Sequence, residues 1–188
     1  MVSSKKQAEI SEQKILSALL KKSPQTYTEL LQTTKMSSRT LHKALHRLEE
    51  QGKVLRKIEI SGKYPPPVLY NLTEEGKKSL TLRGIIEAYS LGVPKDTLLK
   101  VMLEKVKEPE KKIDEFKAFL EILDILGPER ANTLIDFFDT PLHTLKTPLI
   151  FSMEEIKKLL QIFMRYEPYR TELKNLLGIQ EPQEGKTS

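Results

Sequence analysis

The sequence predicts a mainly α-helical fold with one small β-hairpin in its first half. Apolar residues recur three and four positions apart along most of the chain, as they do in amphipathic helices. This period changes once, between residues 53 and 72, where two short β-rich segments flank a turn of glycine and prolines. These observations and an uneven charge distribution divide the chain into an N-terminal mixed region and a C-terminal all-helical region.

The charge is concentrated in the first region. The chain has 188 residues and a net charge of +5. Residues 1–82 hold 15 Lys and Arg against 8 acidic residues, a net charge of +7, whereas residues 83–188 have a net charge of −2. A basic first part beside a mildly acidic second part indicates a polyanionic partner for the first part alone.

The composition argues against several other classes of protein. The chain contains no cysteine, so it has neither disulfide nor thiolate chemistry. No secretory signal and no apolar run of about 20 residues is present, so we expect a cytoplasmic protein without membrane contact. The many Lys and Glu residues are typical of a thermophilic or archaeal prokaryote.

The most informative segment covers residues 37–52. Its apolar positions have the spacing of one helix face: Leu41, Ala44, Leu45 and Leu48. The opposite face and its flanks are basic: Arg39, His42, Lys43, His46 and Arg47. Ser37 suits the N-cap and Gly52 the C-terminal end. We expect a helix that is buried on one side and fits a DNA major groove on the other, although an ordinary amphipathic surface helix has the same pattern.

Two shorter helices are expected before this segment. Residues 8–22 have helical periodicity, and residues 1–7 are polar and expected to fray. Residues 25–27 read as a short extended segment. Thr28 is expected to cap a second helix, and residues 33–36 form the turn into the third.

A β-hairpin is expected after the third helix. Residues 53–60 and 68–72 alternate as strands. Between them lie Gly62 and three consecutive prolines at 65–67, which suit a stiff, cationic tip. Thr73 then caps another helix.

This order of elements resembles the winged helix-turn-helix domains of prokaryotic transcriptional regulators of the MarR, PadR and HxlR kind. The resemblance covers residues 8–82 and rests on local strings such as Leu48-Glu49-Glu50-Gln51-Gly52 and Tyr70-Asn71-Leu72-Thr73 followed by Glu74-Glu75-Gly76. It implies that the third helix lies in the major groove and the hairpin, or wing, on the minor groove or the backbone. By position it implies ten DNA-binding residues: Ser38, Arg39, Thr40, His42, Lys43, Arg47, Arg56, Lys57, Lys63 and Tyr64.

The second half is helical by period, with no family resemblance. We expect helices over residues 74–91, 95–107, 110–126, 130–138, 152–166 and 168–178. Gly127-Pro128 should break the chain, and Ser152 with Glu155 should form a capping box. The expected domains are a winged helix-turn-helix over 1–82, a helical dimerisation or effector domain over 83–179, and a disordered tail over 180–188.

The helix over residues 110–126 is apolar on most sides from Phe116 onward and must be covered. We therefore expect a homodimer whose interface lies within residues 80–178. A small-molecule effector site among these helices is a second interpretation of this half, although no cluster of polar residues marks a pocket for it.

Catalytic and metal sites are not expected. His42 and His46 have a spacing that can bind zinc, but zinc needs at least three protein ligands, and the one other histidine is His143. The acidic residues of the second half are scattered, and no phosphate loop or nucleophile motif is present. We expect no cofactor, no metal and no enzymatic activity.

The function expected from the sequence is that of a transcriptional regulator that binds double-stranded DNA sequence-specifically. The alternative is a winged-helix adaptor that assembles proteins. The basic face of the third helix favours the regulator, because an adaptor has no need of a cationic surface that fits a groove.

Overall fold

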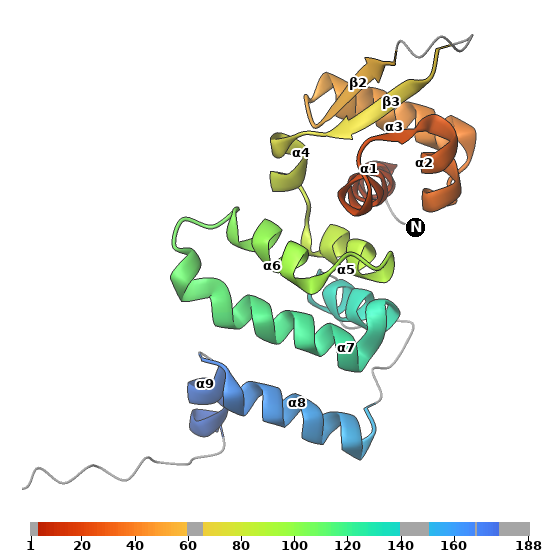
Figure 1. Cartoon of the computed structure of the whole chain (residues 1–188). Helices are drawn as coiled ribbons and strands as arrows, with labels where there is room; N and C mark the ends of the chain where they lie inside the picture. The colour runs from red at the N-terminus through yellow and green to blue at the C-terminus, as the bar shows by residue number, and fades with distance from the viewer. Residues whose placement is uncertain (1–3, 60–65, 140–150, 168, 177–188) are drawn as a thin grey trace, which may run out of the picture.

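The structure, a computed structural model, describes residues 4–59, 66–139, 151–167 and 169–176. Its elements lie in successive layers from one end of the molecule to the other (Figure 1). The first layer contains α1 Ser4–Lys21, β1 Gln25–Thr26, α2 Tyr27–Thr34, α3 Ser38–Glu50, β2 Val54–Ile58, β3 Val68–Leu72 and α4 Glu74–Lys78. The following layers contain α5 Leu82–Ser90, α6 Lys95–Leu103, α7 Pro109–Asp139, α8 Met153–Arg165 and α9 Tyr169–Leu176. A mainly helical fold with a small β-hairpin is therefore confirmed.

Helix α1 is the centre of the first layer. It packs against both α3 and α5, and Ile15, Leu16 and Leu19 are completely buried. The helix begins at Ser4, so residues 4–7, which were expected to fray, are helical. Because α1 is packed on two sides, its apolar residues cover more of its surface than the single stripe of a surface helix.

The cap of helix α2 lies two residues before the threonine expected to cap it. The cap is Thr26, not Thr28: the Thr26 hydroxyl accepts from the Glu29 amide, and the Thr26 amide donates to the Glu29 carboxylate at 2.7 Å. This reciprocal box satisfies two amides that the helix start leaves unpaired. The Lys22 ammonium, 2.6 Å from Glu29, and the Thr26 bonds lower the pKa of that carboxyl to about 2.

The three strands form one antiparallel sheet in the order β1-β3-β2, which confirms the short extended segment and the hairpin. Tyr70 on β3 is buried in the core. On β2 only Val54 is buried, and residues 55–58 are exposed on both faces. Strand β2 therefore leaves the core after its first residue, whereas β3 keeps Tyr70 in it.

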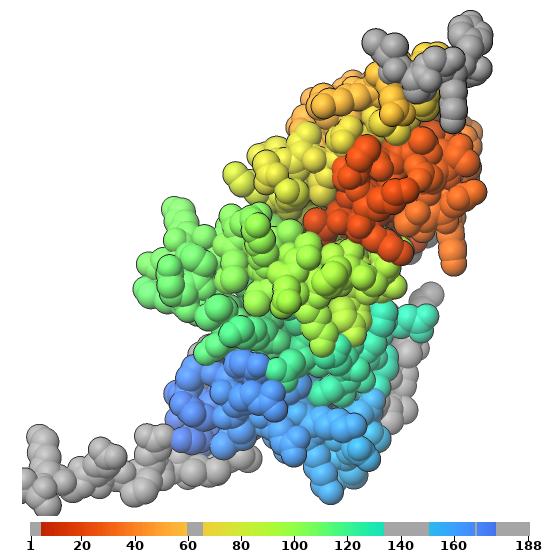
Figure 2. Space-filling model, viewed as in Figure 1, coloured from red at the N-terminus to blue at the C-terminus, as the bar shows by residue number. Residues whose placement is uncertain are grey.

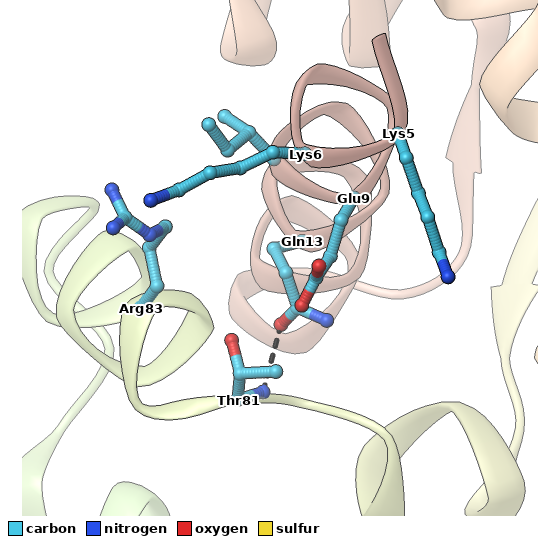
Figure 3. A pocket seen from close by; sticks show the side chains of 7 residues that line it. Lys5, Lys6, Glu9, Gln13, Thr81 and Arg83 are labelled. Atoms are coloured by element: carbon cyan, nitrogen blue, oxygen red, sulfur yellow. Dashed lines mark hydrogen bonds between the residues drawn. The ribbon is translucent and has the colours of Figure 1, made fainter. Parts of the chain in front are cut away.

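A break at residues 79–81 replaces the continuous helix expected over residues 74–91. Thr73 caps the short α4 as predicted, but Thr81 then caps a separate α5. The Gln13 side chain holds the break, because its amide nitrogen donates to the Ser79 carbonyl at 3.1 Å and its oxygen accepts from the Thr81 amide at 2.8 Å. Figure 3 shows the second of these bonds between α1 and the start of α5. A bond from a distant helix thus decides where α4 ends.

The hydrophobic core continues from the first layer into α5. The Ser17 hydroxyl of α1 lies 2.7 Å from the Gly84 carbonyl of α5. A Cβ atom at Gly84 would lie 2.2 Å from the Gln13 side-chain oxygen, so any larger residue there would displace the side chain that holds the break. The domain boundary expected at residue 82 therefore falls inside a packed interface.

Helix α7 is covered within the chain. Its buried apolar side chains include Ala118, Leu120, Leu123, Leu126 and Ala131, and α5, α6 and α8 pack against it. Gly127 has a φ of 72°, so the expected break at Gly127-Pro128 is present as a kink. The need for cover, from which we expected a homodimer, is met by the chain itself. The homodimer stays a prediction that requires another basis.

The last layer contains α8 and α9. Ser152 and Glu155 form the expected capping box of α8. Arg130 and then Ser152 bond to Glu155 and lower its carboxyl pKa to about 2. Residues 180–188, expected to be a disordered tail, lie outside the described residues. Across the described ranges, no helix is long and apolar enough to cross a membrane.

Candidate nucleic-acid interface

Helix α3 is fixed by its ends and by its buried face. The Ser37 hydroxyl accepts from the Thr40 amide at 3.2 Å, and Gly52 takes a φ of 68° just after the C-terminal end. Both ends are as predicted. The apolar stripe is at most 2% exposed along its length: Leu41, Ala44, Leu45 and Leu48. The opposite face of α3 is therefore held toward solvent.

That opposite face is cationic. Arg39, His42, Lys43 and His46 are exposed, and the first turn of α3 contains no acidic residue. Arg39, Lys43 and Arg47 are spaced four residues apart, so they follow one another along the helix, and we call them the cationic row. An uninterrupted row of cations attracts a polyanion and repels other cations.

Arg47 is the one member of the row that is partly buried. Its Nε donates to the Glu12 carboxylate of α1 at 2.7 Å. This ion pair ties α3 to α1 and offsets the charge of Arg47, so Arg47 helps to orient α3 and adds little net charge to the row.

A hollow of about 280 Å³ lies beside the cationic row. One wall comes from α1, through Gln7, Ala8 and Ser11, and the other from α3. The sequence predicted a helix that includes Ala8 and Ser11, but it did not predict that this helix lies beside α3, because that contact is tertiary. The α1 wall is uncharged, so all the basic side chains of the hollow come from α3.

The hydroxyl groups at the start of α3 are engaged locally. The Tyr27 hydroxyl donates to the Ser38 carbonyl at 2.8 Å and lies 2.8 Å from the Ser38 hydroxyl. The Thr40 hydroxyl is similarly 2.8 Å from that of Ser37. Ser38 and Thr40 were predicted to bind DNA directly, and here they also stabilise the helix start. Tyr27 was missed, and only its place at the first position of α2 could have indicated it.

The predicted wing residues are not all brought together. Arg56 and Lys57 are both exposed on β2, but neighbouring residues of a strand point to opposite faces. Arg56 pairs with Tyr70 on the core side and Lys57 with Leu69 on the outer side. Lys63 and Tyr64 lie outside the described residues. One flat surface can therefore contact Arg56 or Lys57, but not both equally.

No metal site is apparent in the part of the chain that the structure describes, where no three His, Cys, Asp or Glu side chains gather to hold an ion. His46 instead has its Nδ1 3.3 Å from the Glu50 carboxylate, one turn further along α3. His143, the third histidine, lies outside that part. The two histidines of α3 therefore belong to its exposed polar face.

Three helices followed by a hairpin, with a cationic row on the third helix, define a winged helix-turn-helix domain of the DNA-binding class. In agreement, residues 9–54 match the family model described as winged helix-turn-helix DNA-binding. The match runs from α1 to the first residue of β2 and confirms the resemblance at this level, while it singles out none of the narrower regulator families. No match was found among curated proteins or solved structures.

Proposed function

We propose that this protein is a transcriptional regulator that binds double-stranded DNA sequence-specifically, with α3 in the major groove. The observation that carries the proposal is the cationic row on a helix whose other face is locked in the core. A helix of this width fits the major groove, where arginine can read guanine and lysine can bind phosphates. In this proposal Arg39 and Lys43 enter the groove, and Arg47 orients α3 against α1.

The wing adds a second contact in this proposal. Either Arg56 or Lys57 binds the sugar-phosphate backbone beside the groove that α3 occupies. Backbone contacts position the protein without reading sequence, so this contribution is to affinity. The proposal assigns no catalytic step and no cofactor to the chain.

A small-molecule effector stays a prediction. The place to test for effector binding is the hollow of about 440 Å³ between α7 and α8. Charged side chains of both helices line this hollow, among them Asp124 and Arg165.

The test is a titration of labelled genomic DNA fragments at two salt concentrations, followed by the variant Arg39→Ala on the fragment bound best. We expect a loss of about 1–3 kcal/mol of specific binding, which is roughly 5- to 150-fold in affinity, with little change in melting temperature. Lys107→Ala is the matched control, because it removes one exposed positive charge far from α3. Normal binding by Arg39→Ala, or an equal loss in Lys107→Ala, would count against the assignment.

The second candidate function is that of a protein adaptor, and one observation favours it. Leu55 and Ile58 on β2 are 48% and 61% exposed, and apolar side chains on an edge strand suit contact with another protein. Absence of DNA binding even at low salt would favour this function. Binding that weakens steeply with salt would favour the regulator.

A further inference from the structure

The turn between α2 and α3 contains a backbone conformation that its side chain does not favour. Lys35 has a φ of 53° and a ψ of 27°, which lie in the left-handed helical region. Among the described residues it is the one residue other than glycine with a positive φ. A residue with a Cβ atom adopts this region at a cost in free energy, and helices that end in this way usually place glycine there. Strain of this kind is found mainly at functional sites.

The fold accounts for the backbone of this turn. The Lys35 amide donates to the Leu31 carbonyl at 3.1 Å and so ends α2. Met36, the next residue, packs against the hydrophobic core, and Ser37 then caps α3. These three residues lead the chain from one helix into the next. The turn therefore requires the left-handed backbone but not the lysine, since glycine or asparagine adopts that backbone more easily.

The side chain of Lys35 has no structural role that would explain its presence. It is exposed, and its ammonium group has no hydrogen bond or ion pair with the described residues. A positive charge near the end of a helix interacts favourably with the helix dipole. That benefit does not require a strained position, because the last turn of α2 contains no basic residue and could carry the charge itself. The lysine is therefore better explained by a partner outside the chain.

Lys35 lies beside the start of the cationic helix α3. It precedes the Ser37 cap by two residues, a separation of at most about 7 Å between the two Cα atoms. Figure 2 shows the neighbouring helix α2 on the outer surface of the first layer, at the end of the molecule away from α8 and α9. An α-helix with its side chains is about 10–12 Å across, and the major groove is about 12 Å wide. A helix in this groove is flanked by the two sugar-phosphate backbones, so the chain that leads into it passes one of them.

We propose that Lys35 binds a phosphate of the DNA backbone at the wall of the major groove, next to the start of α3. This inference rests on the proposed function, since it takes α3 to lie in that groove. An ammonium group binds phosphate as a compact point charge and does not read the base sequence. Lys35 therefore adds affinity for DNA of any sequence, whereas Arg39 contributes to the choice of sequence. The turn remains strained because the contact requires a long cationic side chain at this point.

The variant Lys35→Gly separates the contact from the fold, because it should change stability and DNA affinity in opposite directions. Glycine relieves the strain, so the melting temperature should rise by about 2 °C. Loss of one phosphate contact should weaken binding roughly tenfold at about 50 mM salt and reduce the slope of log affinity against log salt by about one unit. The loss should be equal for the genomic fragment bound best and for unrelated DNA of the same length. Thermal denaturation and anisotropy titrations measure these effects.

Two further variants complete the test. Lys35→Arg keeps both the charge and the strain, so its melting temperature, affinity and salt slope should stay close to those of the wild type. Lys107→Gly makes the same substitution as Lys35→Gly in another loop between two helices, α6 and α7, and should leave affinity and slope unchanged. An unchanged slope in Lys35→Gly, or a loss confined to the best-bound fragment, overturns the inference and leaves the proposed function intact. A wild-type chain without salt-dependent DNA binding overturns the proposed function, and the inference with it.

Discussion

Helices α3 and α8 are alike in almost every local respect. Each has 13 residues, and each begins after a serine whose hydroxyl accepts from the third helical amide, although α3 buries four side chains and α8 one, Ile162. They differ in the first turn, which lacks acids in α3 and contains Glu154 and Glu155 in α8. They also differ on the exposed face, which is cationic in α3 and apolar in α8. The caps and the buried side chains stabilise each helix, and the residues on its exposed face determine the class of partner that it can bind.

The largest expected effect is a difference in stability between two alanine variants, one at a leucine on the buried face of α3 and one at a leucine on the exposed face of α8. Leu45 of α3 is 2% exposed, whereas Leu160 of α8 is 41% exposed. Leu45→Ala should lower the free energy of unfolding by about 3 kcal/mol, because it leaves a cavity in the core. Leu160→Ala should cost less than about 0.5 kcal/mol at concentrations where the chain is monomeric. Urea denaturation measures both, and similar losses would contradict the contrast between the two faces.

A smaller effect should follow from giving α3 the acidic first turn of α8. Thr40 occupies the position in α3 that Glu155 occupies in α8. Thr40→Glu should keep or slightly raise the melting temperature, because it completes a capping box. It should weaken DNA binding by roughly tenfold, because it brings a negative charge to the phosphates. Thr40→Gln, which caps without the charge, is the control. Undiminished binding by Thr40→Glu would remove the start of α3 from the interface.

The wing allows a finer test of the basic surface. Because Arg56 and Lys57 lie on opposite faces of β2, only one should bind the backbone. One of Arg56→Ala and Lys57→Ala should reduce the slope of log affinity against log salt by about one unit, and the other should leave it nearly unchanged. Anisotropy titrations over a salt series measure the slope. Equal reductions would mean that the wing rotates on binding or that DNA contacts its edge.

The smallest effect concerns the cap of α8 and its dependence on pH. The folded-state pKa of Glu155 lies near 2, below its ordinary value of 4.5, first because Arg130 bonds to it. A lowered carboxyl pKa stabilises the fold above the ordinary value, and this stabilisation is lost as the pH falls toward the folded value. Glu155→Gln should therefore be less stable than the wild type above pH 4.5, and the difference should shrink as acid is added. Denaturant titrations at several pH values measure this.

The matched control is Glu154→Gln, which removes a neighbouring acid outside the capping box. A stability difference for Glu155→Gln that stays constant down to low pH would contradict the ion pair with Arg130.

The sequence predicted α3 and the capping box of α8 well because local residues determine both. Ser37, Gly52 and the apolar stripe of α3 lie within a few turns of one another. The cap of α2 is also local, and the Thr26-to-Glu29 spacing was a usable signal that the choice of Thr28 overlooked. Both the caps and the buried faces of such helices can be read from spacing alone.

Features that depend on distant contacts could not be predicted in the same way. The break between α4 and α5 depends on Gln13, which is more than sixty residues away in the chain. The pairing of Arg47 with Glu12 and the cover of α7 by α8 are likewise tertiary. A boundary at residue 82 looked natural from composition, yet Ser17 and Gly84 meet across it. For the candidate site, the chemistry of α3 was predictable, but the contribution of α1 was not.

Two consecutive residues of α1 bind to different parts of the molecule. Glu12 binds Arg47 of α3, and Gln13 binds the segment that leads into α5. A rotation of α1 about its axis would strain both bonds together, so α1 mechanically couples the helical layers to α3 and its cationic face. Such coupling is reciprocal in free energy: a ligand of the helical layers that changed DNA affinity by some factor would have its own affinity changed by DNA by the same factor.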